Sequence, residues 1–140
     1  MWIGWSFLLK NKNSFLIVFI KFSGWLEIFF GVMFFFMDPL MSLLEIPNFV
    51  FWTLFSGVTL FYMGILLLYS ARDLEKYKII PIVSSFFRFT MAVIVVITII
   101  TNNQPILSIV LIFAALYDFS SALFTLILLK NCGYFKKIEN

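Results

Sequence analysis

IIPIVSSFFRFTMAVIVVITIITNNQPILSIVLIFAALYDFSSALFTLILL, residues 79–129, consists of two long apolar stretches separated by a short polar one. A helix that crosses a bilayer needs about 20 predominantly apolar residues. The stretches at about Ile79–Thr101 and Ile106–Leu129 both meet this length. The connection Asn102–Pro105 is short, polar and turn-forming. We therefore predict two transmembrane helices that run antiparallel beside each other.

Two further apolar stretches precede this pair, at about Phe15–Met37 and Phe49–Ser70. Of the 140 residues, 63% are hydrophobic and only 12% are charged. A soluble domain of this length needs far more charged surface. The predicted fold class is thus an all-α membrane protein, with four transmembrane helices in an antiparallel up-down bundle that forms a single domain over residues 1–140.

Lysine and arginine lie on one side of the predicted bundle. Nine of the ten basic residues lie before or at the start of the first span, between the second and third spans, or after the fourth. They are Lys10, Lys12, Lys21, Arg72, Lys76, Lys78, Lys130, Lys136 and Lys137. The other two connections contain Asp38 and Glu45 but no basic residue. Because basic loops stay in the cytoplasm, we predict a multi-pass protein with both termini cytoplasmic. The many Phe, Ile, Asn and Lys residues are typical of an AT-rich bacterial genome, so we expect the inner (plasma) membrane of a bacterium.

Two short segments outside the spans have an interfacial character. Trp2–Lys10 is apolar, too short to cross, and carries tryptophans that favour the headgroup region. Pro39–Pro47 has the period of a short amphipathic turn, with Glu45 toward water on the outer face. The first five residues, Met1–Trp5, lack a basic start and a small-residue cleavage site, so we expect no removable signal peptide.

Three ionisable residues lie inside the predicted spans: Glu27, Arg88 and Asp118. At 1.5 Å per residue each falls roughly 15–18 Å from an interface, which is near the bilayer midplane. An isolated charge at this depth costs about 2.5–3.5 kcal/mol on insertion scales, and such residues are candidates for function by default. The three residues are therefore the candidate intramembrane polar site.

The residues three or four positions from each charge are mostly small. Gly24 and Gly31 share a face with Glu27; Ser84, Ser85 and Ala92 with Arg88; and Ala114, Ala115, Ser121 and Ala122 with Asp118. Small residues line helix interfaces in membranes because they let backbones approach. We therefore predict that the three charged side chains converge on the bundle interior.

Pairing with a carboxylate offsets much of the cost of burying Arg88. The third and fourth helices are joined by a tight turn, which favours Asp118 as its partner. Glu27 is then either a second partner of the guanidinium or a protonated carboxyl. Three hydroxyl-bearing residues at similar depth complete the candidate site: Thr59, Tyr62 and Tyr117.

Glycines repeat at a spacing of seven in the first two spans. Gly24 and Gly31 lie in the first, and Gly57 and Gly64 lie in the second. This spacing predicts a close-packed seam between these two helices.

With four predicted spans, the chain resembles the small bacterial DoxX-like membrane proteins and related families of unknown function. The resemblance covers most of the chain through short motifs: Gly24, Glu27 and Gly31, then Asp38-Pro39, Gly57, Gly64, Ala71-Arg72-Asp73, Arg88 and Asp118. The chain departs from the DoxX pattern after Gly31, where Val32 and Met33 replace a Gly-then-Lys feature, so a quinone- or redox-linked role is not carried over. Small multidrug transporters also have four helices with a glutamate in the first, but lack the Arg88 and Asp118 arrangement.

Three functions are compatible with these features. The first is a protein that handles protons or a small solute at the charged cluster; the second is an accessory or assembly subunit of a membrane complex, in which the ion pair is purely structural. The third, a lipid-modifying enzyme, needs carboxylates as acid and base and an opening to lipid. With no histidine and only Cys132, we expect no catalytic nucleophile, metal or cofactor. The expected partners are the bilayer and either a second copy or a larger complex; dispersed basic residues argue against nucleic acid.

Overall fold

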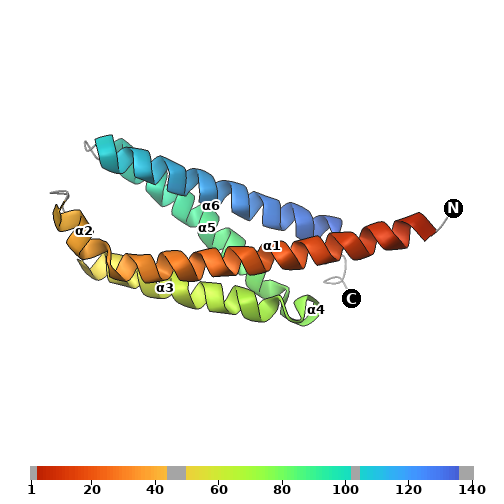
Figure 1. The fold of residues 1–140 in the computed structure, drawn as a ribbon. Coiled ribbons are helices and arrows are strands. Elements are labelled where there is room, and N and C mark those ends of the chain that lie inside the picture. The colour runs from red at the N-terminus through yellow and green to blue at the C-terminus, as the bar shows by residue number, and fades with distance from the viewer. Residues whose placement is uncertain (1–2, 44–49, 102–104, 136–140) are drawn as a thin grey trace.

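The computed structural model describes residues 3–43, 50–101 and 105–135. They form six helices and no strand: α1 Ile3–Phe35, α2 Met37–Leu43, α3 Val50–Ser70, α4 Leu74–Tyr77, α5 Ile79–Thr101 and α6 Pro105–Asn131 (Figure 1). Four of them contain a segment long and apolar enough to cross a membrane: Asn13–Phe35, Thr53–Ser70, Ile79–Thr101 and Leu111–Asn131. The all-helical class is confirmed, and so is the prediction of four helices long and apolar enough to span a membrane.

The N-terminal flanking segment is helical. Residues from Ile3 to Lys10 continue α1 without a break, and the apolar span within this helix begins at Asn13. In Figure 1 this end of α1 projects beyond the other helices. The segment predicted from Pro39 begins within α2, while Trp2, Glu45 and Pro47 lie outside the described residues.

The long helices pack as two pairs. α1 packs along α3, and α5 packs along α6, whereas contacts between the pairs are much sparser. Figure 1 shows the two pairs close together near α4 and spread apart toward α2. The contacts between the two helix pairs are therefore concentrated in the half of the molecule near α4.

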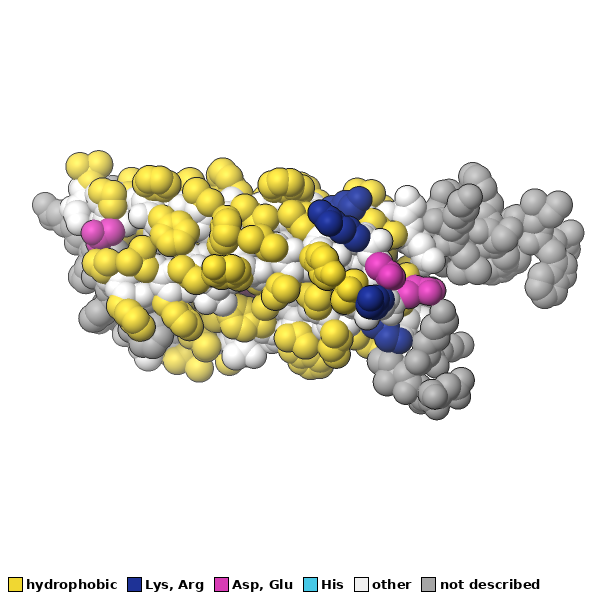
Figure 2. Space-filling model, turned by 90° about the horizontal axis from the view of Figure 1, so that it is seen from below, with side chains coloured by type: hydrophobic (Ala, Val, Ile, Leu, Met, Phe, Trp, Pro, Cys, Tyr) yellow, Lys and Arg dark blue, Asp and Glu magenta, His cyan; other side chains and the backbone are white. Residues whose placement is uncertain are grey.

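The apolar core lies in that same half. Its buried members come from every element except α2: Leu16, Ile20, Leu67, Ala71, Leu74, Ile82, Leu129 and Tyr134. Large apolar side chains elsewhere on the spans are exposed, as expected for a surface solvated by lipid. Figure 2 shows hydrophobic side chains over most of one face, with Lys and Arg gathered beside acidic groups near one end.

At the end of α6 the chain turns back onto this core. Gly133 adopts a left-handed φ of 79°, and the amide of Tyr134 donates to the carbonyl of Leu129 over 3.1 Å. This is the hydrogen bond of a Schellman cap, in which the residue after the glycine packs back on the last turn. Tyr134 and Leu129 are accordingly both buried in the core cluster.

The predicted glycine seam between α1 and α3 is confirmed. A Cβ added at Gly64 would lie 2.6 Å from the carbonyl oxygen of Gly24, and one added at Gly31 would lie 2.8 Å from that of Gly57. Real Cβ atoms do not approach backbone this closely, so the helix pair relies on bare backbone at these crossings. The seam fixes the position of α1 and hence of Glu27.

Substitution of Gly64→Ala is expected to destabilise the α1–α3 pair, because the new methyl group meets backbone that cannot move aside. Overpacking of this kind costs about 1–3 kcal/mol. The measurement is the free energy of unfolding in a bilayer nanodisc. Ala114→Val is the matched control, since it adds methyl groups at an exposed position of α6. Equal stability of the two variants would contradict the close contact.

Candidate functional site

A buried ion pair between Arg88 and Glu27 joins the two helix pairs. Arg88 extends from α5 and Glu27 from α1, and their exposed fractions are 5% and 4%. The Nε of Arg88 donates to Oε1 of Glu27 over 2.8 Å, and Nη2 donates to the same oxygen. Because the pair bridges α1 and α5, it supplies a specific contact where apolar packing between the pairs is sparse.

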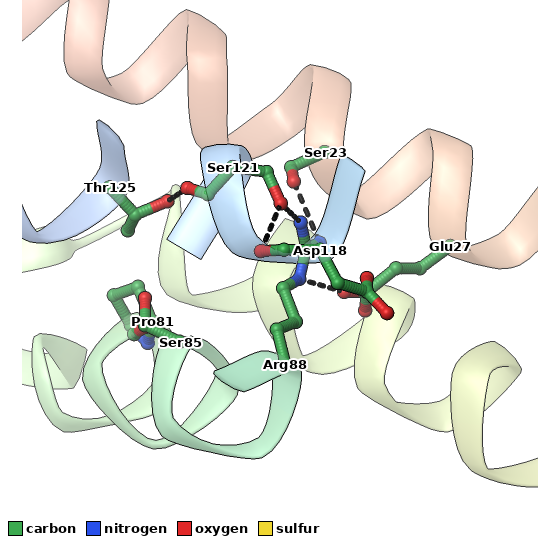
Figure 3. A network of polar contacts seen from close by, with 8 residues as sticks. All are labelled: Ser23, Glu27, Pro81, Ser85, Arg88, Asp118, Ser121 and Thr125. Atoms are coloured by element: carbon green, nitrogen blue, oxygen red, sulfur yellow. Dashed lines mark hydrogen bonds and ion pairs between the residues drawn. The ribbon is translucent and has the colours of Figure 1, made fainter. Parts of the chain in front are cut away.

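Two serines complete the contacts of the guanidinium (Figure 3). Its Nη2 donates to Oγ of Ser23 on α1 over 2.8 Å, and Nη1 donates to Oγ of Ser121 on α6. The Ser121 hydroxyl in turn donates to the backbone carbonyl of Asp118 over 3.2 Å. Four of the five N–H groups of an arginine are thus engaged. A guanidinium this well satisfied is a positioned cation held between α1, α5 and α6.

Asp118 does not take the role that the sequence predicted for it. The ion pair of Arg88 is with Glu27, and among the described residues no hydrogen bond reaches the carboxylate of Asp118. Asp118 is half-buried and interacts electrostatically with both Arg88 and Glu27. α5 and α6 are neighbours, but the rotation of α6 places Ser121, one turn further on than Asp118, against Arg88. The predicted Arg88–Asp118 pair was therefore wrong.

Tyr117 lies beside the cluster, as predicted, but it contacts Arg88 with its ring and not with its hydroxyl. The guanidinium carbon of Arg88 is 5.5 Å from the ring centroid, within the range of a cation–π contact. Its hydroxyl is buried with no hydrogen-bond partner among the described residues. The other orphaned atom of this kind is Oε2 of Glu27. The site thus contains two buried polar atoms whose hydrogen-bonding capacity is unused.

The structure does not bring Thr59 and Tyr62 to the cluster. The Thr59 hydroxyl donates to the carbonyl of Phe55 in its own helix over 2.8 Å. Tyr62 is 62% exposed on the outer face of α3. The position of a hydroxyl along a helix sets its depth, whereas rotation of the helix decides whether it faces the bundle.

The small residues around the charges are buried with one exception. Every predicted interface position named for Glu27 and Arg88 is buried, and so are three of the four named for Asp118. Ala114 is exposed whereas the next residue of α6, Ala115, is buried, so Ala114 lies on the outward face of the helix. The prediction that Ala114 faces the interior was wrong.

Ser23 is the functional residue that sequence reasoning missed. It lies one turn before Glu27 on the same face of α1, and it accepts a hydrogen bond from Arg88. The i, i+4 spacing of Ser23 and Glu27 was a usable signal, since residues at this spacing share a helix face. A hydroxyl one turn from a buried charge is a natural hydrogen-bond partner for the same counterion.

Two cavities border the network. The first, about 10 Å³, is lined by Arg88, Ser23, Ser84, Ser85, Thr125 and apolar neighbours, and is large enough for about one water molecule. The second is an open groove of about 280 Å³ between α1 and α6, here called the α1/α6 groove. Its lining residues are Phe19, Phe22, Ser23, Tyr117, Ser120, Ser121 and Phe124. Ser23 therefore lines both the small polar cavity and the larger apolar groove.

Breaking the ion pair is expected to be costly, and removing both partners is expected to recover much of the loss. Glu27→Gln and Arg88→Met should each lower the free energy of unfolding by about 3 kcal/mol, because each leaves a buried charge or polar group without its partner. The double variant should lose much less than the sum, as measured in a double-mutant cycle in nanodiscs. Glu75→Gln, a carboxylate outside the spans, is the control. Additive losses would contradict direct pairing.

No protein-family model, curated protein or solved structure matches the chain. The resemblance to DoxX-like proteins stays a prediction. Among the described residues, no group of three or more His, Cys, Asp or Glu side chains is placed to hold a metal ion.

Proposed function

We propose that this chain is a multi-pass protein of the bacterial inner membrane whose mid-membrane cluster of Glu27, Arg88 and Asp118 handles protons. In this proposal the four spans run antiparallel and both termini lie in the cytoplasm. The grouping of Lys and Arg near one end of the described surface supports the orientation (Figure 2). The DoxX-like resemblance is part of the same proposal.

The proposal rests on the imbalance of positive and negative groups at the cluster. One guanidinium faces two carboxylates, and only Glu27 is hydrogen-bonded to it. Arginine stays protonated in proteins, so the pair Arg88–Glu27 is neutral and Asp118 is one negative charge in excess. An uncompensated charge near the bilayer centre is costly. Binding a proton at the cluster is the simplest way to remove this cost.

The size of the cavity at Arg88 favours protons over larger solutes. This cavity has about 10 Å³, enough for a single water molecule. A proton can pass along hydroxyls and one water, whereas an organic solute needs a cavity many times larger. A pathway for a small solute would need a second copy of the chain to enclose it.

The residues take distinct roles in this proposal. Asp118 is the group that gains and loses the proton, because its carboxylate lacks the hydrogen bonds that hold Glu27. Arg88 and Glu27 form the neutral pair that positions it, and Ser23 and Ser121 hold the guanidinium in place. The half-buried position of Asp118 gives it access that Glu27 lacks.

Asp118→Asn is expected to abolish proton binding at the cluster while leaving the Arg88–Glu27 pair intact. Infrared difference spectra of the protein in nanodiscs during a pH titration should show a carboxylic-acid band that is absent in this variant. Protein-dependent proton flux into liposomes under an applied potential should fall to the level of empty liposomes. Glu75→Gln, outside the spans, should change neither reading. An unchanged band and flux in Asp118→Asn would exclude this residue as the proton site.

One observation favours the alternative, an accessory subunit in which the cluster is structural. Four of the five guanidinium N–H groups are already satisfied within the chain, so a static role needs no ligand. The Asp118→Asn variant distinguishes the two functions. A structural role predicts an unchanged proton flux, no titrating band, and a stoichiometric protein partner after mild solubilisation.

A further inference from the structure

The small cavity beside Arg88 has a polar lining drawn from three helices. Ser23 of α1, Ser84, Ser85 and Arg88 of α5, and Thr125 of α6 all border it. Every residue that lines this cavity of about 10 Å³ is buried. Cavities that stay dry in proteins are apolar, whereas a polar one of this size is filled by a water molecule.

Ser84 has a hydroxyl that the chain leaves unused. Its side chain is 2% exposed, and it forms no hydrogen bond within the described part of the chain. The neighbouring hydroxyls behave differently, since Ser85 donates to the carbonyl of Pro81 and Thr125 to that of Ser121, each over 2.8 Å. A buried hydroxyl without a partner is costly. Ser84 therefore needs a partner that the described residues do not supply.

Unused donors and acceptors border the same cavity. The oxygen of Ser23 accepts from Arg88 over 2.8 Å, but the Ser23 hydroxyl hydrogen has no acceptor among the described residues. Nη1 of Arg88 makes one hydrogen bond, to Ser121, so its second hydrogen is free. The oxygens of Ser84, Ser85 and Thr125 retain lone pairs. The matching ligand is one that both accepts and donates hydrogen bonds.

Size and charge restrict this ligand further. The volume of about 10 Å³ admits a single molecule no larger than water. A cation is disfavoured because Arg88 itself borders the cavity. A further anion is disfavoured because Glu27 and Asp118 already outnumber this guanidinium. A neutral molecule with two donors and two acceptors meets all of these conditions.

We propose that the cavity beside Arg88 is a binding site for one ordered water molecule, which accepts from Arg88 and Ser23 and donates to Ser84. Because Ser23 lies on α1 and Ser84 on α5, this water links the two helix pairs beside the ion pair. It also satisfies the fifth N–H group of the guanidinium. The inference does not depend on proton handling, since it rests on the cavity and the unused hydroxyls.

The test detects this water at the arginine side chain. The chain contains two arginines, Arg72 and Arg88, so isotope-labelled arginine reports on two guanidinium groups. In nanodiscs, nuclear Overhauser effects between water and the side-chain N–H groups should show a long-lived water at Arg88. Arg72 should contact only fast-exchanging water, because it is exposed.

Ser84→Val should remove the long-lived water, because its methyl groups fill the cavity. Ser120→Val is the matched control, since Ser120 is exposed and bonds only to carbonyls of its own helix. Infrared spectra in heavy-oxygen water separate water from protein hydroxyls, because only the water band shifts. One shifted O–H band is expected in the native protein and in the control, and none in Ser84→Val.

Ser84→Ala keeps the test decisive if the larger side chain disturbs the fold. It adds no atoms to the cavity and removes one partner of the water, so the lifetime of the water should fall about fivefold, the factor for one net hydrogen bond. A native protein with no long-lived water at Arg88 would overturn the proposal. A signal that survives Ser84→Val in a folded protein, or an unchanged lifetime in Ser84→Ala, would do the same.

Discussion

A bilayer core offers a buried charge no water, so a charge that remains there must be satisfied by the protein. This constraint explains the ion pair of Arg88 and Glu27 and the two serines around it. The guanidinium on α5 draws its partners from α1 and α6. Because apolar packing between lipid-solvated helices has no hydrophobic driving force, these polar contacts carry much of the specificity with which one helix pair meets the other.

The pair depends in turn on features that contain no charge. The glycine seam sets how closely α1 approaches α3, and so fixes where Glu27 projects. The apolar core near α4 holds the two helix pairs together on one side of the cluster. On the other side the pairs separate, and this leaves Asp118 only half-buried. The charged site therefore lies at the boundary between a packed and an open half of the molecule.

Sequence reasoning found the apolar helices and the glycine seam, because each is a property of one helix or of a spacing along it. It failed on Asp118, Ala114 and Tyr62, where the rotation of a helix about its axis decides which neighbour a side chain meets. Amphipathic periodicity usually reports this rotation, but lipid-exposed and buried faces are both apolar here. Only the small residues indicated which face of each helix meets its neighbours. Around Asp118 they spread over a wide arc, so they did not show whether Asp118 or Ser121 meets Arg88.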